Sequence, residues 1–276
     1  MTAARHQESL NTLSVGTTGP RIAFLHGLFG QGRNWMQIAK AVSGPHGTDA
    51  RCLLVDLPDH GRSPWSQEFS LDAYADAVAG TLRGTAPEEP WTVVGHSLGG
   101  KVAMVLALRH PDLVERLVVV DIAPKGYGSL ERFEGYIREM QDLPLTDLTS
   151  RADAEARFDE PDPGVKAFLL QNLRRDGHSW RWQVNLDLVA GDAALGSGSR
   201  IADWPDAVDD LPPYAGPVLW IAGGDSRYIQ RQDAERMRRH FPRTRLFTIK
   251  GVGHWVHTDA PEIVVTALRR VLHAPA

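Results

Sequence analysis

The sequence predicts an α/β protein, in which a mostly parallel sheet has helices on both faces and is interrupted by a helical insertion. In the first and last parts of the chain, short apolar runs alternate with helical patterns. That order is typical of parallel strands joined by right-handed crossovers. Residues 117–120 are apolar throughout, as in strands buried on both faces. Between residues 126 and 213 helical patterns continue without a strong strand, which indicates the insertion.

The first part of the chain contributes four predicted strands and three predicted helices. The strands are expected at residues 21–25, 52–55, 91–94 and 117–120. The helices are expected at residues 34–42, 71–83 and 98–109. Ser70 is a suitable N-cap for the second helix. The negative charge of Asp72, in the first turn, interacts favourably with the positive end of the helix dipole. Pro111 ends the third helix.

The insertion separates these elements from a second strand–helix stretch. Its predicted helices are residues 131–140, 152–158, 165–173 and 180–189. After it come predicted strands at 218–222 and 245–249 and predicted helices at 230–240 and 261–272. This division predicts a core made of residues 1–125 and 213–276, with a helical domain at residues 126–212.

Composition excludes several classes of protein. The chain has 276 residues and a net charge of −4, so nothing favours nucleic acid or an acidic membrane as a partner. A single cysteine, Cys52, excludes an intrachain disulfide and fits a reducing, cytoplasmic setting. We find no apolar run of about 18 residues, no signal-peptide pattern at the N-terminus and no zinc or calcium spacing. We therefore expect a cytoplasmic protein without a metal; nothing indicates its oligomeric state.

A nucleophile elbow is predicted at Gly95-His96-Ser97-Leu98-Gly99, which fits the pattern G-x-S-x-G. The pentapeptide is weak evidence alone, but here it follows a predicted strand and opens a predicted helix. Such a strained turn raises the Ser97 hydroxyl above the sheet, and the flanking glycines allow strand and helix to approach closely. The alternative is a plain glycine-rich turn, which the strand–helix context disfavours.

Two further groups complete the expected chemistry. A serine hydroxyl needs a base, and His254 is the candidate because it follows the last strand in a glycine-rich loop. The developing oxyanion needs N–H donors. We expect these from Leu98, at the start of a helix, and from Leu28 in the turn after the first predicted strand, with Phe29 as the less favoured donor.

A competing interpretation is a nucleotide-binding P-loop. Residues 95–101 also fit G-x-x-x-x-G-K. Val102 stands where a serine or threonine would ligate Mg²⁺. Nucleotide binding would also leave the histidine loop near the C-terminus unexplained, so we disfavour it.

These motifs resemble α/β-hydrolases, and the likeness runs from about Arg21 to Leu272. It is carried by residues 26–30, 56–63, 95–101 and 251–257. A narrower likeness, at residues 119–124, 168–173, 180–186 and 223–226, is to the YbfF-type esterases and their mitochondrial abhydrolase relatives. The resemblance implies an α/β-hydrolase fold with a helical cap, and cleavage of short-chain esters, sometimes thioesters, without a cofactor.

The resemblance also frames the choice of the acid that orients His254. In most α/β-hydrolases the acid lies three residues after the glycine that ends the seventh strand, and here that residue is Ser226. Asp225 stands one residue early. The YbfF-like relatives resemble enzymes with the acid after the sixth strand, which here is Asp121. We favour Asp121 and keep Asp225 as the alternative.

The function expected is a serine esterase for short to medium acyl chains, working through an acyl-enzyme. The aromatic side chains of the cap expected to contact substrate are Phe168, Trp180 and Trp182, and Phe29 of the core is expected to join them. The alternative for the three cap residues is that they form the interior of the cap. The same residues would serve a thioesterase or a perhydrolase. A non-catalytic small-molecule-binding homologue is the alternative from another class.

Overall fold

The computed structural model of the chain describes residues 9–44 and 49–273. Its centre is a seven-stranded sheet in the order β1-β3-β2-β4-β5-β8-β9. The strands are β1 Thr12–Val15, β2 Arg21–Leu25, β3 Arg51–Val55, β4 Trp91–His96, β5 Val114–Val120, β8 Val218–Gly223 and β9 Thr244–Ile249. Strand β1 is antiparallel to β3, and the other neighbouring pairs are parallel. The predicted α/β class with a mostly parallel sheet is confirmed.

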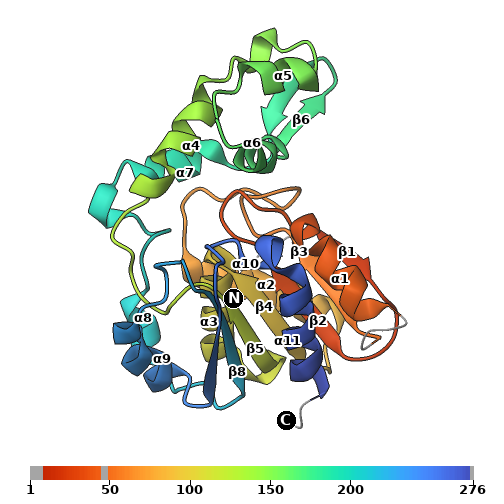
Figure 1. The fold of residues 1–276 in the computed structure, drawn as a ribbon, viewed down its shortest axis with the longest axis vertical. Helices are drawn as coiled ribbons and strands as arrows, with labels where there is room; N and C mark the ends of the chain where they lie inside the picture. The colour runs from red at the N-terminus through yellow and green to blue at the C-terminus, as the bar shows by residue number, and fades with distance from the viewer. Residues whose placement is uncertain (1–8, 45–48, 274–276) are drawn as a thin grey trace, which may run out of the picture.

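Helices cover both faces of this sheet (Figure 1). One face packs against α1 and α11, and the other against α2, α3 and α9. Side chains alternate between these layers along each strand, so Phe24 joins the first core and Leu25 the second. The core helices are α1 Met36–Ser43, α2 Leu71–Thr85, α3 Leu98–Arg109, α8 Asp206–Asp209, α9 Ala234–His240, α10 Val256–Asp259 and α11 Pro261–His273. Among the described helices, none is long and apolar enough to cross a membrane.

A cap is inserted between β5 and β8 and lies as a separate layer beyond the sheet (Figure 1). It consists of α4 Glu131–Asp142, α5 Arg151–Arg157, α6 Pro163–Leu170, β6 Leu173–Asp176, β7 Ser179–Trp182 and α7 Leu186–Ala193. All of these elements fall within the predicted insertion. Its boundaries at residues 126 and 212 stay a prediction.

The cap is not wholly helical, and two helix predictions are wrong in part. Residues 173–176 and 179–182 form an antiparallel hairpin, so the helix expected at 165–173 ends at Leu170 and the one expected at 180–189 begins only at Leu186. Gly177 has a φ of +61° in the two-residue turn, the backbone region that such hairpins require. The turn reverses the chain and overrides the helical spacing of the apolar residues.

Two buried asparagines tie the cap to the core. The Gln31 side-chain amide donates to Oδ1 of Asn172 at 2.9 Å, and Nδ2 of Asn172 donates to the Phe29 carbonyl at 2.8 Å. Asn185 donates from Nδ2 to Oδ1 of Asp59 and from its backbone N–H to the Asp59 carbonyl, both at 2.8 Å. Asn172 and Asp59 are both fully buried. Because buried amides and carboxylates are costly without partners, these contacts hold the cap in place.

Candidate active site

Ser97 lies in a strained turn between β4 and α3. Its φ is +53°, a region in which non-glycine residues are uncommon. A Cβ at Gly95 would lie 2.1 Å from the Gly99 carbonyl oxygen, and one at Gly99 would lie 2.4 Å from that of His26. Only glycine permits these approaches, so the two glycines of the motif make the tight turn possible.

His254 and Asp121 form a hydrogen-bonded pair. The imidazole Nδ1 and carboxylate Oδ2 are 2.7 Å apart. Because an ionised carboxylate can only accept, Nδ1 carries the proton, and Nε2 keeps a lone pair able to take a proton from a hydroxyl. The Asp121 carboxylate is fully buried and also accepts from the Gly223 N–H at 2.9 Å and from the Ser226 hydroxyl. These donors fix its orientation.

Asp225, the alternative acid, lies elsewhere. It is exposed, and its backbone N–H donates to the Val252 carbonyl at 3.0 Å. Within the described ranges, no hydrogen bond joins its carboxylate to His254. Ser226, at the position where most α/β-hydrolases have the acid, donates instead to Asp121. The geometry therefore favours Asp121 as the acid.

Aromatic rings also position His254. The ring of Tyr228 stacks on the imidazole, with centroids 3.9 Å apart and planes 22° from parallel. His96 lies on another side at 4.7 Å, and its Nε2 is 2.9 Å from the His254 carbonyl oxygen. Burial, with the neighbouring His257 and His254, lowers the pKa of His96 well below its ordinary value, so this neighbour stays uncharged. No sequence motif pointed to Tyr228.

The two residues expected to supply oxyanion donors, Leu28 and Leu98, lie beside Ser97. Leu98 is the first residue of α3, so its N–H has no acceptor within the helix. Leu28 and Leu98 both line a small cavity together with Ser97. The N–H of Phe29 instead donates to Nε2 of His60 at 3.3 Å. This contact removes Phe29 as an oxyanion donor and favours the pair Leu28 and Leu98.

Two buried histidines shape the loop that carries Leu28. Nε2 of His26 accepts from the Leu57 N–H at 3.0 Å, and its Nδ1 donates to the Gly27 carbonyl at 2.8 Å. Nδ1 of His60 donates to the Pro58 carbonyl oxygen at 2.9 Å. Burial lowers the pKa of both rings. The pKa of His26 falls to about 3, because the nearby His60 ring lowers it further. Each ring therefore stays neutral and acts as one donor and one acceptor.

Two pockets, which we call the arms of the cavity, share Leu28, Ser97 and Phe133 in their walls. One arm, of about 280 Å³, contains Leu98 and extends beneath the start of the cap. The other, of about 510 Å³, contains His254. Phe29 and Phe168 line this larger arm, and the Phe168 ring lies 5.3 Å from that of Trp255.

Trp180 and Trp182, the other expected substrate contacts, line neither arm. Their indole N–H groups donate to the carbonyls of Leu148 and Met140 inside the cap. An indole donor needs such an acceptor when buried, and the cap backbone provides it. Both tryptophans therefore belong to the interior of the cap.

Lys101, the residue that made a P-loop conceivable, lies one helical turn after Ser97 and is buried. Its ammonium donates to the carbonyls of Ala202 and Asp203, each at 2.7 Å, and to that of Ile201 at 3.4 Å. Burial lowers the pKa of Lys101 to about 7, opposed by the nearby Asp203 carboxylate. The side chain thus joins α3 to the segment through which the cap returns to the core. The described residues contain no group of three or more histidine, cysteine, aspartate or glutamate side chains able to hold a metal.

A serine in a tight strand–helix turn lies at the end of a parallel sheet, near a hydrogen-bonded histidine–aspartate pair. This arrangement is typical of α/β-hydrolases. The sequence profile of the alpha/beta hydrolase fold matches residues 20–261, and the chain belongs to this family. It is 37% identical to the sn-1-specific diacylglycerol lipase ABHD11 of Mus musculus over 96% of this chain and 84% of that protein. It is 31% identical to esterase YbfF of Escherichia coli over 91% of this chain and 92% of that one. Among solved structures, an esterase from a marine microorganism superposes with a TM-score of 0.85 at 28% identity, over 94% of this chain and 98% of that one.

Proposed function

We propose that the chain is a serine esterase that cleaves carboxylic esters of short to medium acyl chains through an acyl-enzyme. The observation that carries this proposal is the Asp121–His254 pair, whose Oδ2 and Nδ1 atoms are 2.7 Å apart, with His254 and Ser97 lining one cavity. Ester hydrolysis as the reaction class is supported by relatives that are named esterases and a lipase. Family membership is consistent with the same chemistry.

We assign the catalytic roles as follows. Ser97 attacks the ester carbonyl while Nε2 of His254 takes the hydroxyl proton. The N–H groups of Leu28 and Leu98 stabilise the oxyanion of the tetrahedral intermediate. His254 then gives its proton to the leaving alcohol, and an acyl group remains on Ser97. A water molecule, activated by His254, releases the acid.

The alcohol and the acyl group of the substrate are assigned to different arms. Because His254 protonates the leaving alcohol, that group must lie in the 510 Å³ arm, which contains His254. The acyl group then takes the 280 Å³ arm beside Leu28 and Leu98. At ~30 Å³ for a water-sized group, the smaller arm holds about nine such groups. That capacity fits a short or medium acyl chain.

The larger arm suits a bulkier alcohol. Polar side chains of Asn34, Gln37 and Gln171 line it beside the aromatic rings. A leaving group with both hydroxyl and apolar parts matches this mixture. Glycerol esters have this character, and one relative is named a diacylglycerol lipase.

The experiment is a panel of p-nitrophenyl esters from acetate to palmitate, assayed with the wild type and with Ser97→Ala. We expect the highest kcat/KM between two and eight acyl carbons and, for Ser97→Ala, a loss on the order of 10⁶ in kcat. Labelling of the wild type, but not of the variant, by a fluorophosphonate would identify Ser97 as the nucleophile. A well-folded wild type that neither reacts with the probe nor cleaves any ester would instead indicate a binding protein.

A further inference from the structure

The last strand of the sheet is uncovered to an unusual degree. Strand β9 pairs with β8 on one side and forms the other edge of the described sheet. Its central residues are all exposed, including Leu246 at 53% and Phe247 at 43%. Alternate residues of a strand face opposite sides, so side chains on both faces of this edge strand lack full cover.

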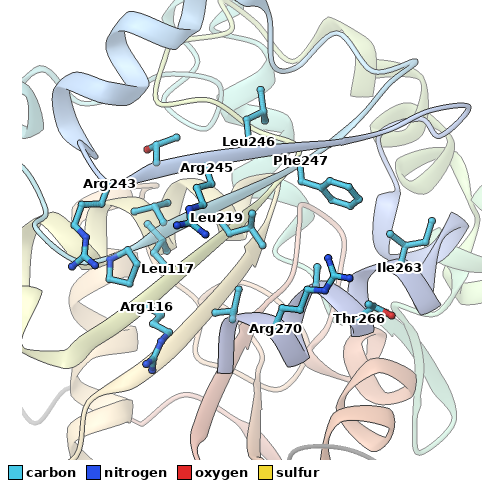
Figure 2. Close-up of a pocket in the computed structure, with 15 residues that line it drawn as sticks. Arg116, Leu117, Leu219, Arg243, Arg245, Leu246, Phe247, Ile263, Thr266 and Arg270 are labelled. Atoms are coloured by element: carbon cyan, nitrogen blue, oxygen red, sulfur yellow. The ribbon is translucent and has the colours of Figure 1, made fainter. Parts of the chain in front are cut away.

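A groove runs along one of these faces, between β9 and α11 (Figure 2). Its volume is about 810 Å³, which exceeds that of either arm of the active-site cavity. Leu219 and Phe247 from the sheet and Ile263 and Val271 from α11 give it an apolar floor. None of its lining residues lines either arm of the active-site cavity.

Arginines surround this floor. Figure 2 shows Arg243 and Arg245 on the side of β9, and Arg270 extending from α11. Arg116, also in the wall, is paired with Glu115. Across the described residues, the other three guanidinium groups have no carboxylate within ion-pair distance, and no described lining residue carries a carboxylate. The groove is therefore positive in a chain whose net charge is −4.

We propose that this groove binds a long-chain carboxylate, with its acyl chain on the apolar floor and its head group on a guanidinium group of the wall, that of Arg245 or Arg270. Guanidinium groups bind carboxylates through paired, charge-assisted hydrogen bonds. The apolar floor gains from removing a hydrocarbon chain from water. A neutral lipid would leave the arginines unused, and a cationic one would be repelled.

A second copy of the chain fits this groove less well. Antiparallel pairing of two β9 strands would extend the sheet, as exposed edges allow. It would also bring Arg243, Arg245 and Arg270 of both copies to one interface. Like charges opposed in this way disfavour association. Charge complementarity thus selects an anionic occupant.

Isothermal titration calorimetry with dodecanoate, below its micellar concentration, tests the proposal. Dodecanol and dodecyltrimethylammonium serve as charge controls, and octanoate and decanoate vary the chain. We expect dodecanoate to bind at least tenfold more tightly than either control. Each methylene that reaches the floor should tighten binding about fourfold.

Variants locate the site. Arg245→Ala/Arg270→Ala should weaken dodecanoate binding at least tenfold, whereas Arg239→Ala, an exposed arginine on α9 outside the groove, should not change it. Unchanged hydrolysis of p-nitrophenyl acetate by the double variant verifies that it is folded. Equal binding by wild type and double variant would overturn the proposal, as would failure of dodecanoate to bind. Binding of an acidic peptide without binding of dodecanoate would overturn it too and indicate a protein partner.

Discussion

Replacing Asp121 by asparagine removes one charge and reverses one hydrogen bond. In the wild type, Oδ2 of Asp121 accepts from Nδ1 of His254 at 2.7 Å, while Oδ1 accepts from the Gly223 N–H at 2.9 Å. An asparagine has one oxygen, which the Gly223 N–H holds. Its NH₂ group then faces Nδ1, so Nδ1 must accept and the imidazole proton moves to Nε2. In that tautomer Nε2 cannot take the proton of Ser97.

The expected loss in kcat is on the order of 10⁴, the value known for this change in the serine-protease template. It corresponds to about 5.5 kcal/mol at 1.36 kcal/mol per tenfold. The assay is steady-state hydrolysis of p-nitrophenyl butyrate, with circular dichroism to verify folding. Asp225→Asn is the matched control, because that carboxylate is exposed and one residue from Ser226; its kcat should stay within tenfold of wild type. If Asp121→Asn keeps a tenth of the activity, or if Asp225→Asn is the more impaired, the assignment is wrong.

Three further predictions concern the surroundings of the site. Lys101→Met leaves the carbonyls that the ammonium binds without a donor, so urea unfolding should report a loss of about 1–3 kcal/mol in unfolding free energy. Unchanged stability would contradict a structural role for the Lys101 hydrogen bonds. The pKa of His26 is lowered to about 3, so between pH 6.5 and 3 the unfolded chain binds a proton that the folded chain does not. The His26 contribution to the unfolding free energy should fall as pH falls, by about 1.7 kcal/mol from pH 6.5 to 5. His26→Gln should therefore lose less stability than the wild type over this range, and an equal loss would contradict the reasoning. Leu130→Ala enlarges the smaller arm, and the ratio of kcat/KM for octanoate over butyrate esters should rise about tenfold; a shift in alcohol preference instead would reverse the assignment of the arms.

The sequence predicted the core well because its signals are local. Strand β2 and helix α3 begin and end at the expected residues, since an apolar run and a glycine turn are sufficient to define them. Strand β1 was missed, because four residues at a sheet edge, with Leu13 exposed, carry little hydrophobic pattern. The cap hairpin was missed because two tryptophans at alternate positions were interpreted with helical spacing.

For the candidate site, too, residues with a local sequence signal could be predicted and the others could not. Ser97, His254 and Asp121 could be selected because each follows a strand whose end faces one edge of the sheet. The stacking of Tyr228 on His254 could not, since it depends on the path of a loop. Aromatic residues in the cap gave no indication of which side they face: Phe168 lines the cavity, while Trp182 is held inside by a carbonyl.

The asparagine ties between cap and core have a consequence for how substrate arrives. Four buried hydrogen bonds, made by Asn172 and Asn185 with Gln31, Phe29 and Asp59, would have to break for the cap to lift away. At about 1 kcal/mol each, they limit a lifted state to roughly one molecule in a thousand. We therefore expect substrate to reach Ser97 as single dissolved molecules while the cap stays in place, and hydrolysis not to accelerate when the substrate forms droplets. An oil–water interface is not expected to raise the rate of hydrolysis, because the cap does not have to lift for substrate to enter.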